Sequence, residues 1–346
     1  MNRSVLRAVF ALLLLSAQPT YADWPDKLFA PYIYGNTGAM IQAYNATGQK
    51  YFTLAFTVSD LRMRRRRPRS ATNPTTLPLA ATLPTTRPLG GNPSFSGHPL
   101  SDHYLADDIA FIRSKGGDVI MSFGGAAGIE LGTTDPDPAK VEAKYQAVID
   151  TYKLTWIDMD IEGRSIRDAN INHIRNTALV NLQRKNPGLI VVYTLAADPN
   201  GIERRGIETL RDAKAQGLKV EAVNLMTMDY GRDLSDGKKM GDLAIATVLA
   251  SYKQMQQIDP AMKIGITPDI GINDEPTEVF GLDDARTVMT WAKTQPYVRL
   301  IAFWVTQRDH ANGRLSQDTA SGVKQNDWDF NNIFNTFTTG FVPVGK

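Results

Sequence analysis

Short apolar segments typical of β-strands alternate along this chain with longer segments of helical periodicity. In the helical segments, apolar residues recur three or four positions apart, as they do from Val141 to Tyr152. Strands that alternate with helices predict parallel β/α units. The strand-like segments number eight: residues 28–33, 51–58, 118–122, 154–161, 189–195, 220–226, 263–267 and 300–305. Eight such units predict an α/β fold that closes into a (β/α)8 TIM barrel.

An open, doubly wound sheet is the alternative fold. Its dinucleotide-binding form has little support, because no Gly-x-Gly-x-x-Gly follows the first strand segment. The composition is that of an ordinary globular protein. The chain has no cysteine, so its fold depends on an apolar core and not on disulfides.

The first 22 residues have the pattern of an export signal. Arg3 and Arg7 supply positive charge, residues 9–17 form an apolar run, and Ala22 offers a small residue at the expected cleavage point. This run is too short to span a membrane, and no later segment is long enough. We therefore expect a secreted protein, extracellular or periplasmic, with no membrane contact after cleavage. Residues 23–346 would form a single domain and a monomer. The alternative is an amphipathic N-terminal helix that stays in the cytosol.

Residues 61–101 interrupt the alternation, in the loop after the second strand segment. They carry seven arginines and no acidic residue, and their Pro, Thr and Leu residues follow no helical or strand period. This composition predicts a disordered insertion. A frameshifted stretch is the alternative, because regular helical sequence resumes at Asp102. Basic runs can bind nucleic acid, but no aromatic residue is interleaved with these arginines, so we expect no nucleic-acid partner.

Three carboxylates alternate with apolar residues in the fourth strand segment: Asp158, Asp160 and Glu162. Successive side chains of a strand point to opposite faces, so these three share a face and lie ~6.6 Å apart along it. Large apolar residues such as Trp156 precede them, which indicates a buried strand. Buried carboxylates are unfavourable unless they are paired, protonated or functional. In a barrel, function lies at the C-terminal ends of the strands. Glu162 would therefore lie at the mouth of an active site, with the two aspartates deeper.

The row resembles the fourth-strand signature Asp-x-x-Asp-x-Asp-x-Glu of glycoside hydrolase family 18, the family of bacterial chitinases. Its last three acids are present, and Thr155 takes the place of the first. Three more strand ends match motifs of this family: Ser122-Phe123-Gly124-Gly125 on the third strand, Met226-Thr227-Met228-Asp229 on the sixth and Trp304 on the eighth. The sixth-strand motif of the family is Met-x-Tyr-Asp, so Met228 replaces its tyrosine. The resemblance extends over residues 29–337, apart from 61–101.

The resemblance implies retaining, substrate-assisted hydrolysis, in which the N-acetyl carbonyl of the substrate attacks the anomeric carbon and forms an oxazolinium intermediate. Glu162 would act as general acid and then as general base. Asp160 would orient the acetamido group, and Asp158 would share a proton with Asp160. Neighbouring carboxylates do not all ionise easily, so their pKa values should spread and keep one of them protonated near neutral pH.

The resemblance also implies the contacts with the sugar. Asp229 and Tyr230 would contact the acetamido group, Met226 would pack beneath the sugar, and Trp304 would cover its apolar face. The substrate would be chitin or N-acetylglucosamine oligomers. An endo-β-N-acetylglucosaminidase of N-glycans and a non-catalytic chitin-binding lectin are the alternatives. The four histidines show no metal-ligand spacing, so we expect neither a metal nor an organic cofactor.

Overall fold

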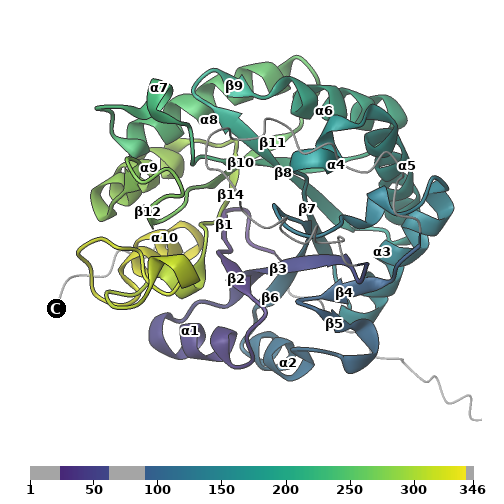
Figure 1. Ribbon diagram of the computed structural model, residues 1–346, viewed down its shortest axis with the longest axis horizontal. Helices are drawn as coiled ribbons and strands as arrows, with labels where there is room; N and C mark the ends of the chain where they lie inside the picture. Colours follow the sequence, from purple (N-terminus) through teal and green to yellow (C-terminus); the bar gives the residue numbers. More distant parts are fainter. Residues whose placement is uncertain (1–23, 62–89, 340–346) are drawn as a thin grey trace, which may run out of the picture.

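The computed structural model describes residues 24–61 and 90–339. The expected export signal and most of the arginine-rich segment lie outside the described residues. Helices surround a central set of strands in the ribbon view (Figure 1). None of the helices in the described ranges combines the length and the hydropathy that a transmembrane span needs.

Eight parallel strands close on themselves within the described ranges, which confirms the barrel and the presence of a strand at each of the eight predicted places. The bounds of the last strand differ, because it begins at Val298 and ends at Ile301. The first is split into β1 (Leu28–Phe29) and β2 (Tyr32–Tyr34). The closure takes place at this split, because β1 pairs with the last strand and β2 pairs with the second. The others, in spatial order, are β3 (Tyr51–Ser59), β6 (Asp118–Gly124), β7 (Trp156–Asp160), β8 (Ile190–Asp198), β10 (Val220–Met226), β11 (Lys263–Thr267) and β14 (Val298–Ile301).

The connecting helices run back along the outside of the barrel. They are α1 (Ala39–Thr47), α2 (Ala106–Ser114), α3 (Pro138–Tyr152), α5 (Ala169–Lys185), α6 (Arg204–Gln216), α8 (Met240–Gln256), α9 (Leu282–Thr294) and α10 (Asp329–Thr339). The start of α3 illustrates why they form where they do. The side chain of Asp137 accepts a hydrogen bond from the backbone N–H of Ala139 (2.9 Å), and Pro138 occupies the first helical position, where it loses no hydrogen bond.

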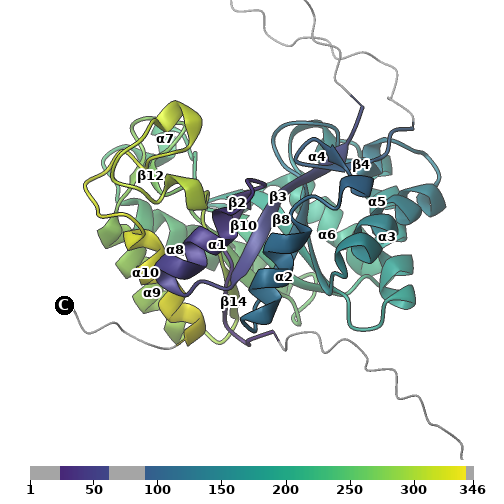
Figure 2. The same cartoon turned by 90° about the horizontal axis from the view of Figure 1, so that it is seen from below.

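Short elements gather at one end of the barrel, which is the end where the parallel strands finish. They include α4 (Gly163–Arg167), α7 (Arg232–Ser235), β9 (Gly201–Ile202), β12 (Gly271–Ile272) and β13 (Val279–Phe280). Figure 2 shows α4, α7 and β12 together at this end. The loops that carry function in a barrel start here.

The two faces of β7 have different surroundings. Ile157 and Met159 belong to the main core, which packs the barrel against its helices. Trp156 belongs to a separate apolar cluster with Ile120 and Val192 of the neighbouring strands. Because side chains alternate along a strand, Asp158 shares the inner face with Trp156 and lies nearer the C-terminal end. The expected placement of the carboxylates on the inner face is therefore confirmed.

The predicted disorder is wrong for the last part of the segment 61–101. Here β4 (Pro93–Phe95) and β5 (His98–Pro99) form a hairpin, and β4 pairs antiparallel with β3. A 3-10 turn, η1 (Leu100–Asp102), follows. The side chain of Phe95 is fully buried, which stabilises the hairpin on the barrel. Strands of two or three residues are too short to show a period in the sequence.

Candidate active site

A cavity of about 600 Å³ opens at the C-terminal end of the barrel. Its lining residues are Tyr32, Tyr34, Phe56, Ala126, Ala127, Asp160, Glu162, Thr194, Ala196, Ala197, Asp198, Glu203, Met226, Met228, Asp229, Tyr230, Thr267, Asp269, Asp274, Trp304 and Asp318. Among the described residues that form this lining, eight are carboxylates and none is a lysine, arginine or histidine. Six of the seven predicted site residues belong to it; Asp158 lies beneath.

Asp158 is a buried carboxylate held by three hydroxyl groups. The hydroxyls of Tyr32 (2.8 Å) and Ser122 (2.7 Å) donate to its Oδ2, and that of Thr194 (2.7 Å) donates to its Oδ1. Burial raises the pKa of Asp158 to about 6, and these three hydrogen bonds limit the rise. Ser122 is thus a structural residue under the site.

Asp160 lies one step higher and lines the cavity. Its side chain is buried, and its Oδ1 has no hydrogen-bond partner among the described residues. Burial raises the pKa of Asp160 well above its usual range, and the charges of Glu162 and Asp158 and a hydrogen bond with Glu162 add to the rise. Asp160 therefore holds a proton more firmly than an ordinary aspartate, and it lies directly below Glu162 in the wall of the cavity.

Glu162 ends the row at the mouth, where its side chain is half-buried. Burial raises the pKa of Glu162, the hydrogen bond with Asp160 lowers it, and the charge of Asp229 raises it further. The chain turns sharply after it, because Gly163 adopts a left-handed conformation (φ 53°) and starts α4. The carboxyl group therefore stands at the end of a rigid strand and can exchange a proton with a molecule in the cavity.

Trp304 forms one wall of the cavity together with three other aromatic residues. Its ring lies nearly parallel to that of Phe56 (centroids 5.6 Å apart, 14° between planes) and edge-on to that of Tyr34 (5.2 Å, 86°). The ring of Tyr32 lies 5.8 Å away. Such a group presents a rigid, flat, apolar surface, which suits the apolar face of a sugar ring.

The chain is similar to known chitinases in both fold and sequence. The catalytic domain of a hyperthermophilic chitinase from Pyrococcus furiosus has 30% sequence identity, with a TM-score of 0.75 over 94% of this chain and 99% of that one. The chain belongs to glycoside hydrolase family 18, the chitinase family. It is thus a glycoside hydrolase by family.

Other similarities agree with this family. The chain is 28% identical over 341 residues to a probable bifunctional chitinase/lysozyme of Escherichia coli strain K12, which covers 91% of this chain and 35% of that protein. It spans about a third to a half of the length of the curated relatives it matches. A family 18 chitinase from Pseudoalteromonas aurantia has the same fold, with 17% identity, a TM-score of 0.52, and coverage of 81% of this chain and 95% of that one. No family model matches the chain.

The position that the first acid of the family 18 signature would occupy lies outside the cavity. Thr155 lies at the N-terminal end of β7, opposite the cavity, and its hydroxyl accepts a hydrogen bond from the indole N–H of Trp24 (3.0 Å). The substitution therefore changes a contact at the bottom of the barrel and leaves Asp158, Asp160 and Glu162 in place.

The residues that follow the sixth strand line the cavity, but their polar groups differ from what the family motif implies. Met228 faces the cavity where the family has a tyrosine. The hydroxyl of Tyr230 accepts a hydrogen bond from Thr247 of α8 (3.2 Å). The carboxylate of Asp229, at the exposed rim, accepts one from the backbone of Glu275 (3.2 Å). Tyr230 and Asp229 thus border the cavity with polar groups that already have protein partners.

An ionic network at the cavity was not predicted from the sequence. Arg308 is buried and donates to Asp269 (3.0 Å) and Asp318 (3.4 Å). The hydroxyl of Tyr34 donates to Asp318 (2.6 Å), which ties the network to the aromatic wall. The position of Asp269, two residues beyond β11, was the available signal, because it follows a barrel strand at the C-terminal end.

Proposed function

We propose that this chain is a secreted chitinase that hydrolyses the β-1,4 bonds between N-acetylglucosamine units with retention of configuration. The observation that carries the proposal is the row of Asp158, Asp160 and Glu162, which rises from a buried floor to the mouth of an aromatic-lined cavity. Cleavage of a sugar chain needs a proton for the leaving oxygen and stabilisation of a developing positive charge. This row offers both.

In the first step, Glu162 donates its proton to the glycosidic oxygen while the bond from that oxygen to the anomeric carbon breaks. The carbonyl oxygen of the substrate's own acetamido group forms a bond to this carbon, and the positive charge moves onto the resulting oxazolinium ring. The raised pKa of Glu162, which burial causes, keeps the group protonated at higher pH than an ordinary glutamate.

Asp160 orients the acetamido group for this attack. Asp160 lines the cavity beside Glu162, so its carboxylate can accept a hydrogen bond from the acetamido N–H, and a negative charge there would stabilise the oxazolinium ion. The carboxylate can become ionised at that moment if its proton moves to Asp158. Three hydroxyls hold Asp158 in place to receive it.

In the second step, the carboxylate of Glu162 removes a proton from a water molecule. The water oxygen bonds to the anomeric carbon from the face that the leaving group vacated, and the bond to the acetamido oxygen breaks. Two inversions give net retention. Trp304 and Met226 would support the apolar face of the sugar from the cavity wall, and Asp229 and Tyr230 would border the acetamido group.

The Glu162→Gln substitution tests this assignment. It should lower the rate of hydrolysis of N-acetylglucosamine oligomers by at least 10²–10⁴-fold, because the amide cannot donate or accept the catalytic proton. Binding of the same oligomers, measured by calorimetry, should remain. Asp160→Asn should also lose most activity. An active Glu162→Gln enzyme would refute the role of Glu162.

The same assay separates the alternatives. A wild-type protein that binds the oligomers without cleaving them would be a lectin. Release of N-glycans from a glycoprotein, with intact chitin oligomers, would identify an endo-β-N-acetylglucosaminidase. Export and a monomeric state belong to the proposal as well; fractionation of expressing cells and size-exclusion chromatography test them. Nucleic acid should not bind at physiological salt.

A further inference from the structure

A buried ion pair lies beneath the segment that carries Glu162. Arg175 of α5 is completely buried, and its Nε (3.2 Å) and Nη2 (2.8 Å) donate to Oε2 of Glu130. The other oxygen of Glu130 accepts hydrogen bonds from the hydroxyl of Tyr145 and from the backbone N–H of Gly132 (2.7 Å). Both charged groups are therefore fixed on all sides.

The guanidinium group reaches from this pair to the helix that follows Glu162. Its Nη2 also donates to the carbonyl of Ser165 (3.2 Å), and its Nη1 donates to Oδ1 of Asn172 (2.7 Å). The amide of Asn172 in turn donates to the carbonyl of Ile166 (2.8 Å). Two carbonyls of α4 are thus held by side chains of α5.

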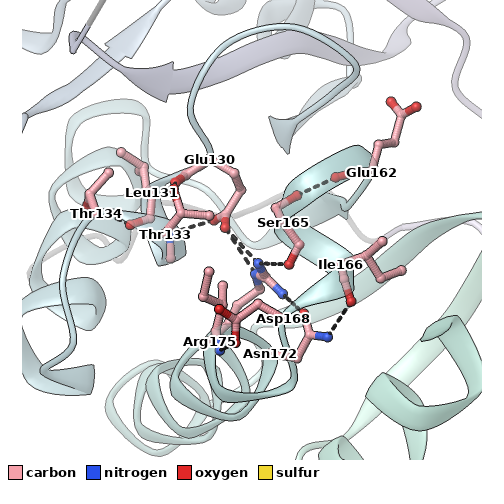
Figure 3. A network of polar contacts seen from close by, with 12 residues as sticks. Glu130, Leu131, Thr133, Thr134, Glu162, Ser165, Ile166, Asp168, Asn172 and Arg175 are labelled. Carbon is pink, nitrogen blue, oxygen red and sulfur yellow. Dashed lines mark hydrogen bonds and ion pairs between the residues drawn. The ribbon is translucent and has the colours of Figure 1, made fainter. Parts of the chain in front are cut away.

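This support matters because α4 has only five residues, which is too short for a helix to be stable by itself. Ser165 connects α4 to Glu162, because its backbone N–H (3.1 Å) and its hydroxyl (2.7 Å) both donate to the carbonyl of Glu162. Figure 3 shows this chain of contacts, with the carboxyl group of Glu162 pointing away from it. The network therefore holds the backbone of Glu162 and leaves its side chain to the cavity.

We propose that Arg175 is a positioning residue: Glu130 holds its guanidinium group, which in turn fixes the backbone that carries Glu162 through Asn172 and α4. The inference rests on the proposed function of Glu162. Stability alone does not explain the ion pair, since buried pairs contribute little compared with apolar residues of the same volume. The planar fork of arginine instead binds a carboxylate, an amide oxygen and a carbonyl in fixed directions. A lysine at this position would keep the charge and lose the fork.

The Arg175→Lys variant tests the inference through kinetics on an N-acetylglucosamine oligomer. A displacement of about 1 Å at a catalytic group can lower a rate about 10²-fold. We therefore expect kcat to fall tenfold or more, with KM within about twofold of wild type. The alkaline limb of the pH profile should move to lower pH, because burial is the largest cause of the raised pKa of Glu162 and a looser Glu162 is more exposed. Distance from Asp229 acts in the same direction, and the smaller effect of a weakened hydrogen bond with Asp160 opposes it. A loss of folded protein alone would not move this limb.

Arg113→Lys is the matched control. Arg113 also pairs with a buried carboxylate, that of Asp118 (2.8 Å), and also donates to a backbone carbonyl, that of Lys153 (3.0 Å). This pair joins the end of α2 to the start of β6, at the end of the barrel away from the cavity. Arg113→Lys should therefore keep the kcat and the pH profile of wild type after correction for folded protein.

A wild-type kcat and pH profile in Arg175→Lys would overturn the inference, as would equal kinetic losses in both variants. If Arg175→Lys does not fold, Asn172→Ala takes its place, because it releases the Ile166 carbonyl and keeps the ion pair. It should show a smaller fall of kcat and a shift of the alkaline limb in the same direction, and wild-type kinetics would overturn the inference. An active Glu162→Gln enzyme would instead refute the proposed function itself.

Discussion

The Tyr32→Phe substitution tests the proton exchange between Asp158 and Asp160. It removes one hydroxyl that donates to Asp158 and keeps the ring that packs 5.8 Å from Trp304. In the proposed mechanism Asp158 receives a proton from Asp160, so it must be ionised beforehand. The acid limb of the pH profile should therefore follow the ionisation of Asp158, whose pKa burial raises to about 6.

The size of the effect follows from the hydrogen bond that is lost. A hydrogen bond to an ionised group contributes about 1.5–3 kcal/mol, and 1.36 kcal/mol changes a pKa by about one. Because the bond favours the charged form, its loss should raise the pKa of Asp158 from about 6 to about 7 or higher. At pH 5, the ionised fraction of Asp158 would fall about tenfold, whereas above pH 8 it would change little.

The assay is kcat/KM on a defined N-acetylglucosamine oligomer between pH 4 and 9. Tyr34→Phe is the control: it loses a hydroxyl in the same cavity, but this hydroxyl donates to Asp318 and not to Asp158. The acid limb should move toward neutral pH by about one in Tyr32→Phe and stay in place in Tyr34→Phe. An unchanged acid limb in Tyr32→Phe would refute the role of Asp158 as proton acceptor.

Two further substitutions test the wall of the cavity and the hairpin. Trp304→Ala should weaken oligomer binding to the inactive Glu162→Gln protein by about tenfold or more, because a large apolar ring surface is lost. Calorimetry measures this binding. Trp291→Ala is the control and should not weaken it, because Trp291 is not part of the cavity lining. Phe95→Ala should lower the free energy of unfolding by about 3–5 kcal/mol in urea titrations. A loss below 1 kcal/mol, as expected for Leu249→Ala on the exposed surface, would show that the hairpin adds nothing to the fold.

Local patterns made the barrel and the carboxylate row predictable. Alternation along a strand depends only on backbone geometry, so the shared face of Asp158 and Glu162 followed from their spacing alone. Their depth followed from strand direction in a barrel. The burial that raises the pKa of Asp158 also agrees with the large apolar residues that precede it in the sequence.

Contacts between distant segments were not predictable in this way. Arg308 and Asp269 are separated by 39 positions, and Arg175 and Glu130 by 45, so no local spacing connects either pair. Each of these ion pairs can be recognised only when the topology of the barrel is known, because the fold brings the two segments together. Phe95 was missed for a different reason: a single apolar residue in a polar segment gives no period, although its burial orders the hairpin.

The two departures from the family 18 motifs differ in their consequences. Thr155 lies at the opposite end of β7, so the absence of an acid there leaves the cavity unchanged. Met228 lines the cavity, and the hydroxyl of Tyr230 already has Thr247 as a partner. The acetamido group of a substrate would therefore depend more on Asp160, which lines the cavity. The Asp160→Asn substitution should therefore lower kcat less in a Met228→Tyr protein than in the wild type, because the added hydroxyl would also bind the acetamido group. An equal loss of kcat in both proteins would contradict this dependence.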